Sequence, residues 1–428
     1  MVRPIVRAAI ALCAASVLSA QQPGRPAPPA PAPTAPAPDA LHAAGKDVTI
    51  SLLTMGSGTE VWELFGHNGI WIHDNVTGQD TVFNWGVFDF HQPRFIQRFL
   101  EGTMLYAMGG DSLPRIMLVY QYLNRSVYAQ ELDLTAAQRD SVLRQIQINA
   151  QPENINYRYD YYRDNCSTRV RDILDRALGG QMHAQAGALT GTTYRWQSLR
   201  LMQGNLPITL GVDIGLGRPA DRDLTVWEEM FLPRHLHDFA ASLQVSDSAG
   251  GTHPLVRRET VLFRANRPPE ADAPPNLLPW LLGAGLVLAG LFAWLGARAA
   301  EGGRGLRVTA AIVIGLWTFV AGLLGVLLTL LWTVTDHVFA HANENLLLFN
   351  PLWLVLLVMI IPALWTGRAS RNARTWAFAL AALAALAPVA HLVRLSAQVN
   401  YPVIAFALPP ALAIAWVMQR LGPGEAPA

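Results

Sequence analysis

The sequence is poor in cysteine and in lysine. Among its 428 residues there are two cysteines, Cys13 and Cys166, and a single lysine, Lys46. Cys13 lies in an N-terminal segment that we expect to be cleaved, so the mature chain has one cysteine and no internal disulfide, although an oxidising compartment is permitted. The net charge is +1. A net charge this close to zero gives no indication of a basic surface, so we expect no nucleic acid among its partners.

The N-terminal part has the pattern of a leader followed by a spacer. Residues 1–20 carry Arg3 and Arg7 and then an apolar run that ends in small residues. This pattern is typical of a secretory signal peptide cleaved after Ala20, and an uncleaved anchor is the alternative. Residues 21–45 are rich in Pro and Ala. Such a composition favours extended polyproline II and cannot bury a core, so we interpret this segment as a linker.

Residues 46–267 mix predicted strands and helices, in an order typical of an α+β domain. We expect this segment to be an exported, periplasmic catalytic domain. Alternation of apolar and polar residues predicts strands, and apolar residues at helical spacing predict helices. The expected strands are 48–55, a hairpin near 67–87, 125–134 and 255–264; the expected helices are 92–100, 136–149 after Thr135, one from Cys166, 196–202 and one within 224–242.

Cys166 lies at the predicted start of a helix. Asp164 or Asn165 is the expected N-cap, and apolar residues recur downstream at helical spacing: Val170, Ile173, Leu174, Ala177 and Leu178. A helix N-terminus stabilises a nearby anion by roughly 0.3–1 kcal/mol, and one pKa unit is about 1.4 kcal/mol. The helix alone therefore lowers a thiol pKa by about one unit at most. A reactive cysteine needs a histidine or another cation in addition.

His67 is the histidine that the pattern supplies. It begins the first strand of the predicted hairpin, after Gly66. A histidine on a strand, followed by a cysteine at a helix start, is the chain order of permuted papain-like folds such as NlpC/P60. It predicts Cys166 as nucleophile and His67 as general base. If the hairpin pairs residues whose numbers sum to about 152–154, Asn84 can orient the imidazole. Asn165 and Asn68 are candidates to hold an oxyanion.

Less reactive interpretations of the same residues stay open. Cys166 could be a small buried apolar side chain, and His67 an ordinary hydrogen-bonded histidine. Arg169, three residues after the cysteine, is a candidate contact for a lipid phosphate, and an ion pair with Asp172 or Asp175 is the alternative.

The composition changes to long apolar runs after the soluble domain. A second Pro-rich linker covers 268–276 and a membrane domain covers 277–420. A helix needs roughly 17–25 apolar residues to cross a bilayer. Five runs meet or approach this length and predict an all-α domain with transmembrane helices at about 277–297, 308–334, 346–365, 376–395 and 403–418. Arginines gather after the first, third and fifth runs, which places those loops in the cytoplasm and the soluble domain outside.

The loop between the second and third runs holds an unusual number of polar residues: Asp336, His337, His341, Asn343, Glu344 and Asn345. We expect Asp336, His337 and Asn345 to contact lipid or substrate. A solvated loop is one alternative, and a metal site at His337 and His341, four residues apart, is another. Our expectation is that no metal or other cofactor is bound.

Three long segments carry a family resemblance: TMGSGTEVWELFGHNGIWI, FNWGVFDFHQPRFIQRFLEGTMLY and PENINYRYDYYRDNCSTRVRDIL. They resemble the Lnb-type bacterial lipoprotein N-acyltransferases, over about Val48 to Leu236. The stretch from Asp336 through NPLWL also resembles the membrane portion of that family.

The resemblance implies a multi-pass enzyme of the bacterial inner membrane. Cys166 would accept an acyl chain from a membrane phospholipid, with His67 as its base, and would pass it to the α-amine of a diacylated lipoprotein. Two other functions remain as alternatives. One is a different envelope cysteine hydrolase, a peptidase or an amidase, and the other is a non-catalytic membrane assembly factor.

Overall fold

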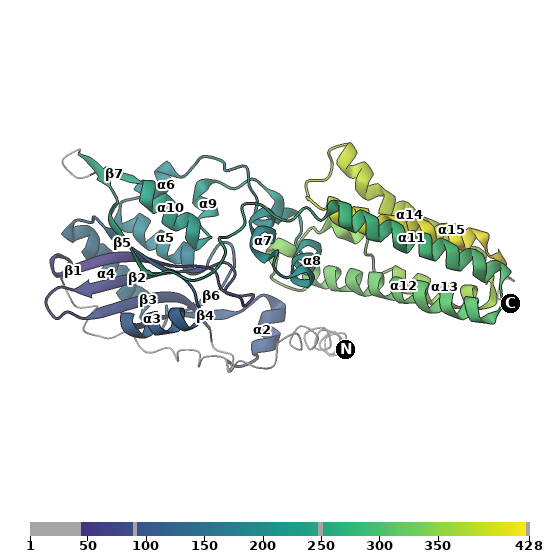
Figure 1. Cartoon of the computed structure of the whole chain (residues 1–428), viewed down its shortest axis with the longest axis horizontal. Coiled ribbons are helices and arrows are strands. Elements are labelled where there is room, and N and C mark those ends of the chain that lie inside the picture. The colour runs from purple at the N-terminus through teal and green to yellow at the C-terminus, as the bar shows by residue number, and fades with distance from the viewer. Residues whose placement is uncertain (1–43, 89–91, 247–250, 425–428) are drawn as a thin grey trace. The chain divides into compact units, whose positions relative to one another are not determined.

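A computed structural model describes residues 44–88, 92–246 and 251–424, and the chain divides into two compact units (Figure 1). Unit 1 consists of Met1–Thr190 and Leu224–Glu270. Unit 2 consists of Gly191–Asp223 and Ala271–Ala428. The expected signal peptide, and the expected linker except its last two residues, lie outside the described residues.

Unit 1 is built on a seven-stranded antiparallel sheet with the strand order β6-β4-β3-β2-β1-β5-β9. Two short strands, β7 and β8, pair with each other outside it. The strands are β1 (Val48–Met55), β2 (His67–Asp74), β3 (Asp80–Val87), β4 (Leu105–Ser112), β5 (Val127–Leu132), β6 (Asn156–Arg158), β7 (Gln244–Ser246), β8 (Thr252–Pro254) and β9 (Val256–Phe263).

Helices cover both faces of this sheet. One face packs against α4, α5 and α10, whose apolar residues join Ile50, Ile70 and Phe83 of the strands in one core. The other face packs against α3 through Ile116 and a smaller cluster. The helices of unit 1 are η2 (Gly45–Asp47), α2 (Phe95–Glu101), α3 (Leu113–Tyr122), α4 (Ala136–Asn149), α5 (Cys166–Ala177), α6 (Gln181–Gln185), α9 (Val226–Glu229) and α10 (Pro233–Ser242).

The hairpin of β2 and β3 has the predicted register. Gly69 pairs with Asn84 and Ile70 with Phe83, so the paired residue numbers sum to 153. The turn closes because the Asp74 carboxylate accepts hydrogen bonds from two backbone N–H groups at 2.8 and 3.1 Å, and Gly78 adopts φ +74°. This register places the Asn84 side chain near the start of β2.

The α+β class and most elements of unit 1 are confirmed. Helix α4 covers the predicted residues and Thr135 forms a capping box with Gln138. The segment 224–242 contains the expected amphipathic helix, α10, and the four-residue helix α9 precedes it. Pro233 explains the break, because proline cannot continue a helix from the preceding turn and is favoured at the first helical position.

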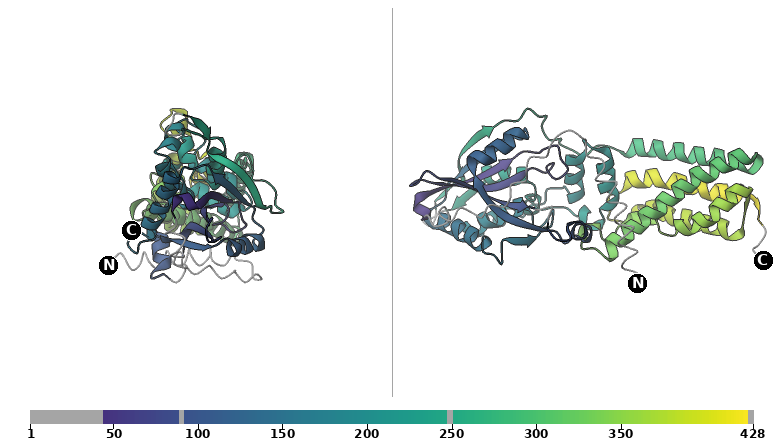
Figure 2. Two further views of the ribbon diagram at one scale, coloured as in Figure 1. Left: turned by 90° about the vertical axis from the view of Figure 1, so that its left-hand side faces the viewer. Right: turned by 90° about the horizontal axis from the view of Figure 1, so that it is seen from below.

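Unit 2 contains a bundle of apolar helices that run alongside one another (Figure 2). Four helices of the described chain are long and apolar enough to cross a membrane: α11 (Leu278–Glu301), α12 (Arg304–Thr333), α14 (Arg371–Leu392) and α15 (Tyr401–Arg420). A fifth helix, α13 (Trp353–Thr366), has 14 residues. At 1.5 Å per residue it spans about 21 Å, less than the roughly 30 Å of a bilayer core. Two-residue strands β10 (Arg368–Ala369) and β11 (Gly422–Pro423) pair beside it.

The expectation of five transmembrane helices is therefore not confirmed, and the third span is the reason. The predicted 346–365 segment forms a helix only from Trp353 onward. Pro351 disfavours helical geometry at Asn350, and the Asn350 side chain accepts a hydrogen bond from the Leu352 N–H at 3.0 Å. The preceding residues form the short helix η5 (Glu344–Leu347), after η4 (Val338–Ala340).

Residues 191–223 belong to unit 2, although the sequence placed them inside the soluble domain. They form α7 (Tyr194–Met202), α8 (Leu206–Gly215) and η3 (Arg218–Asp221). The carbonyl groups at the end of α8 have no partner within the helix. Three amide side chains donate to them: Asn343 and Asn345 to Ile214, and Gln398 to Leu216, at 2.8 to 3.1 Å.

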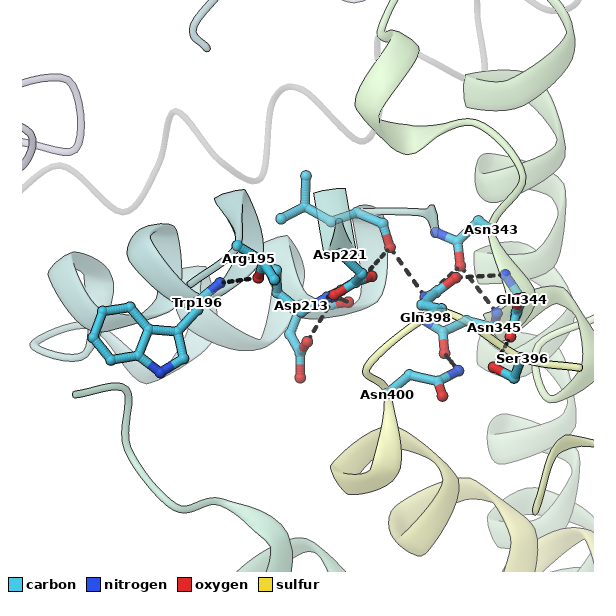
Figure 3. A network of polar contacts seen from close by, with 12 residues as sticks. Arg195, Trp196, Asp213, Asp221, Asn343, Glu344, Asn345, Ser396, Gln398 and Asn400 are labelled. Carbon is cyan, nitrogen blue, oxygen red and sulfur yellow. Dashed lines mark hydrogen bonds and ion pairs between the residues drawn. The ribbon is translucent and has the colours of Figure 1, made fainter. Parts of the chain in front are cut away.

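Arg195 holds the same segment together by charge. It is 2% exposed. Its guanidinium forms ion pairs of 2.8 Å with Asp213 and with Asp221 and donates to the Leu216 carbonyl at 2.8 Å (Figure 3). Every nitrogen of the group thus has an acceptor, which offsets the cost of burying three charges.

We predict that Arg195→Ala lowers the free energy of unfolding by about 3–5 kcal/mol, because it leaves two buried carboxylates without their cation. The matched control is Arg218→Ala, which removes an ion pair to Glu344 from an arginine side chain that is 49% exposed. We expect that loss to be below about 1 kcal/mol. Denaturant unfolding of the detergent-solubilised chain measures both values, and equal losses would contradict this account.

Candidate active site

One end of the sheet brings together the segments that carry the predicted catalytic residues. Met55, the last residue of β1, pairs with His67 at the start of β2 and with Val127 at the start of β5. Helix α5 packs on β2 and β3 and begins at Cys166. Three strand ends and a helix N-terminus therefore meet at this end of unit 1.

The Asn165 side chain determines where α5 begins. Its carboxamide oxygen accepts hydrogen bonds from the N–H groups of Ser167 and Thr168 at 2.9 and 3.0 Å, and Thr168 completes the capping box. Its amide nitrogen donates to the carbonyls of Tyr161 and Phe231, both at 2.9 Å. The N-cap prediction is confirmed. Because both protons of the Asn165 amide are engaged in these bonds, its side chain serves the helix and not an oxyanion.

Gly86 brings the backbone of β3 close to Cys166. The strand is bulged between Trp85 and Val87, and Gly86 adopts φ +92°. A Cβ atom at this position would lie 3.7 Å from the Cβ of Cys166. Residues other than glycine adopt such a φ only with strain, so the bulge depends on glycine at the point where β3 passes the cysteine.

The surroundings of Cys166 have opposing effects on the pKa of its thiol. The residue is partly exposed. Burial raises the pKa of its thiol, while the backbone N–H groups of Asn68 and Ser167 and the charge of Arg125 oppose that rise. The pKa remains above its usual value, so the resting group is a neutral thiol at pH 7. A thiol in this state needs a base in order to act as a nucleophile.

His67 is in the state that a base requires. Its Nε2 lies 3.2 Å from the Asn84 side-chain oxygen, and the Asn84 amide nitrogen donates to the Val82 carbonyl at 3.5 Å. With that oxygen as acceptor, Nε2 carries the proton and Nδ1 keeps its lone pair. Burial, assisted by the charge of Arg125 and opposed by the Asn84 hydrogen bond, lowers the pKa of His67 to about 4. The imidazole is neutral at pH 7.

Arg125 is the charged residue of this site that sequence reasoning missed. It immediately precedes Ser126 and β5, in a stretch that we interpreted only as the start of a strand. Its nearness to His67 follows from the pairing of both β5 and β2 with β1. No local pattern encodes that sheet order, so the sequence held no direct signal for it.

The side chains of Asn68 and Arg169 have other partners than those we anticipated. Asn68 is fully buried, and its amide nitrogen donates to Leu53 and Thr54 of β1 at 3.2 and 2.8 Å. Its backbone N–H, not its side chain, serves Cys166. Arg169 pairs with Asp164, and its Nη2 donates to that carboxylate at 2.7 Å. The ion-pair alternative thus describes Arg169, with Asp164 in place of Asp172 or Asp175.

The three candidate contacts in the polar loop between α12 and α13 belong to unit 2. Asn345 is fully buried and accepts a hydrogen bond from Asn400 at 2.8 Å (Figure 3), so it has no surface to offer a lipid. Asp336 is exposed and His337 is half-buried. His341 bonds the Thr335 carbonyl at 3.0 Å. Among the residues that the structure describes, no group of three His, Cys, Asp or Glu side chains is placed to hold a metal ion.

Comparison with known protein families matches both parts of the chain. The family model of the Lnb N-terminal periplasmic domain matches residues 41–202, and that of the Lnb transmembrane domain matches residues 284–421. No curated protein and no solved structure matches the chain. The first match covers His67, Arg125 and Cys166, and the second covers most of α11 and all of α12, α13, α14 and α15.

We predict that Gly86→Ala slows alkylation of Cys166 by iodoacetamide, because relief of the strained φ moves the backbone beside the thiol. Gly78→Ala is the matched control. Gly78 has φ +74° in the hairpin turn, and a Cβ there meets nothing within 4 Å. Each change should cost about 1–2 kcal/mol of stability, yet only Gly86→Ala should alter the rate, measured by mass on the Cys166 peptide. An equal change in both rates would refute the local role of Gly86.

We also predict that His67 makes unit 1 less stable in acid. Its pKa falls from 6.5 to about 4 on folding, so the unfolded chain binds more protons between these values and stability decreases as the pH drops through this window. The full pKa shift corresponds to a loss of about 3 kcal/mol in the free energy of unfolding at low pH. None of this stability is lost above pH 7. Denaturant unfolding from pH 7 to pH 4 should show a steeper decrease for the wild type than for His67→Gln. Parallel curves would show that His67 is not buried in its neutral form.

Proposed function

The chain belongs to the Lnb-type family, and from this membership we propose that it is a membrane-bound lipoprotein N-acyltransferase with Cys166 as nucleophile. The observation that carries the proposal is local. The backbone N–H of Asn68, the residue next to His67, acts on the sulfur of Cys166 at the N-terminus of α5. A thiol at a helix N-terminus, beside a strand that presents a neutral histidine, is equipped for covalent acyl transfer.

The arrangement supports a permuted papain-like fold, of the NlpC/P60 kind, for unit 1. The histidine strand precedes the cysteine helix in the chain, and that helix packs on the strand and its neighbour. Asn84 occupies the position of the group that orients the imidazole. In this proposal the base, its orienting group and the nucleophile come from three separate elements: β2, β3 and α5.

The first half-reaction forms a thioester. The Cys166 sulfur attacks the carbonyl carbon of a phospholipid ester while His67 Nδ1 accepts the thiol proton. Negative charge develops on the carbonyl oxygen, and the backbone N–H groups of Cys166 and Asn68 are the donors available to hold it. The C–O bond then breaks, His67 returns the proton to the departing oxygen, and a lysophospholipid leaves.

The second half-reaction transfers the acyl chain to nitrogen. The neutral α-amine of a diacylglyceryl-cysteine attacks the thioester carbonyl, and His67 accepts a proton from that nitrogen. The C–S bond breaks and the thiolate takes the proton back, so the enzyme returns to its neutral resting pair. A base with a depressed pKa suits both steps, because it is unprotonated before each of them.

The membrane unit accounts for the location of both substrates. The periplasmic family of the N-terminal domain and the apolar helices of unit 2 describe a multi-pass membrane protein. We propose the inner membrane as its site, with the arginine-rich ends of the helices in the cytoplasm. The acyl donor is then a phospholipid of that membrane and the acceptor a diacylated lipoprotein anchored in it. Asp336 and His337 remain our candidates for a head-group contact.

The test is the mass of the N-terminal lipopeptide of a lipoprotein, from cells depleted of their own N-acyltransferase. We predict that the wild-type chain adds one acyl group and that Cys166→Ala and His67→Gln do not. His73→Gln is the matched control, since His73 lies on the same strand and pairs with Asp80 at 2.8 Å. It should keep the gain in mass.

Two results would overturn the proposal. A gain with Cys166→Ala would exclude the thioester. No gain with any inserted and folded protein would exclude N-acyl transfer and leave the envelope hydrolase or the assembly factor.

A further inference from the structure

Arg125 is a buried arginine whose charge is incompletely paired. It is 5% exposed. Its Nε donates to the Gly56 carbonyl at 2.8 Å, and its guanidinium lies 4.8 Å from the centre of the Tyr120 ring. Glu63 is its carboxylate partner, at a long 3.5 Å from Nη1. Its Nη2 is buried and has no hydrogen-bond partner among the described residues.

Such an arrangement is costly unless the free nitrogen serves an anion. Burying an arginine without a full set of acceptors costs free energy, and an arginine stays protonated under all ordinary conditions. Its charge acts on both predicted catalytic residues, since it lowers the pKa of His67 and opposes the rise in the pKa of Cys166. It therefore favours a thiolate and disfavours an imidazolium in the same site.

Reactive cysteines draw on a nearby cation, and in many thiol enzymes that cation is the histidine itself. Here His67 is neutral at pH 7, so it cannot supply the charge before it has accepted the thiol proton. Of the cations in the described part of unit 1, Arg125 is the one whose charge acts on both His67 and Cys166. Arg169, three residues after Cys166, is neutralised by Asp164.

We propose that the Arg125 guanidinium is the cation that stabilises the Cys166 thiolate, and that the ion pair with Glu63 weakens this effect. The proposal rests on the proposed function, because it assigns a role within the same site. Arg125 acts by stabilising the negative charge on the Cys166 sulfur and takes no direct part in bond making, so it is a positioning residue. Loss of Arg125 should disfavour the thiolate, and neutralisation of Glu63 should favour it.

The other ionisable groups around the sulfur do not blur this effect. Three tyrosines interact with the sulfur, and burial raises the pKa of each, so they stay neutral through the range in which a thiol titrates: Tyr120 of α3, Tyr157 of β6 and the following Tyr159. Asp164 and Arg169 cancel each other. A shift in the thiol titration on changing Arg125 or Glu63 therefore reports those two charges.

The experiment is the pH dependence of Cys166 alkylation by iodoacetamide in the full-length, detergent-solubilised protein, read by mass on the Cys166 peptide. Arg125→Gln should move the midpoint to higher pH and slow the reaction several-fold at pH 8. Glu63→Gln should move it to lower pH and speed the reaction. Arg171→Gln is the control: Arg171 lies on α5, is 7% exposed and packs on Trp227 at 3.9 Å, and its loss should leave the midpoint unchanged.

Opposite shifts in the Arg125 and Glu63 variants support the proposal. A purely structural role of the pair, which ties the Gly56 loop to the sheet, predicts shifts in one direction or none, and either result would overturn it. If Arg125→Gln does not fold, the direction of the midpoint shift in Glu63→Gln decides alone. The readout needs no acyl transfer. If the wild-type protein acylates lipoprotein but the alkylation midpoint is the same in the variants, the role of Arg125 is rejected and the proposed function is kept. If the two variants shift the midpoint in opposite directions but the wild-type protein does not acylate lipoprotein, the role of Arg125 is kept and the proposed function is rejected.

Discussion

The side-chain cap that Asn165 provides for α5 is the interaction on which the candidate site depends. It closes the first turn of the helix and ties that turn to the carbonyls of Tyr161 and Phe231, from two other segments of unit 1. The cap makes Cys166 the first helical residue. Because the first N–H groups of a helix have no acceptor within it, the thiol lies beside hydrogen-bond donors, which the proposed mechanism assigns to the substrate carbonyl.

Burial then determines how the site can work. It raises the pKa of Cys166 and lowers that of His67, so the resting pair is a thiol and an imidazole, not a thiolate and an imidazolium. In the proposed mechanism proton transfer accompanies attack, which makes the orientation of Nδ1 by Asn84 more important than a permanent ion pair. The fixed charge of Arg125 favours the thiolate and disfavours the imidazolium, and it remains in place through both proposed half-reactions.

Local sequence patterns were enough for the features that depend on neighbouring residues. The hairpin register, the Thr135 capping box and the start of α5 at Cys166 each follow from turn chemistry or capping over a few residues. Arg125 could not be found in this way, because only the order of the strands brings β5 to the end of the sheet where His67 lies. The third apolar run was overestimated, because average hydropathy does not register the break at Pro351.

The polar loop of unit 2 shows why composition alone could not assign a role to it. Amides suit the end of α8 because they satisfy carbonyl groups without burying charge. Asn343, Asn345 and Gln398 do this from two connections between apolar helices. The buried charges of this network are those of Arg195 and its two aspartates. Arg218 and Glu344 form a further ion pair nearer the surface. A loop that resembled a metal or lipid site is therefore, at Asn345, an anchor for residues 191–223, and that anchoring explains why these residues pack with the membrane helices.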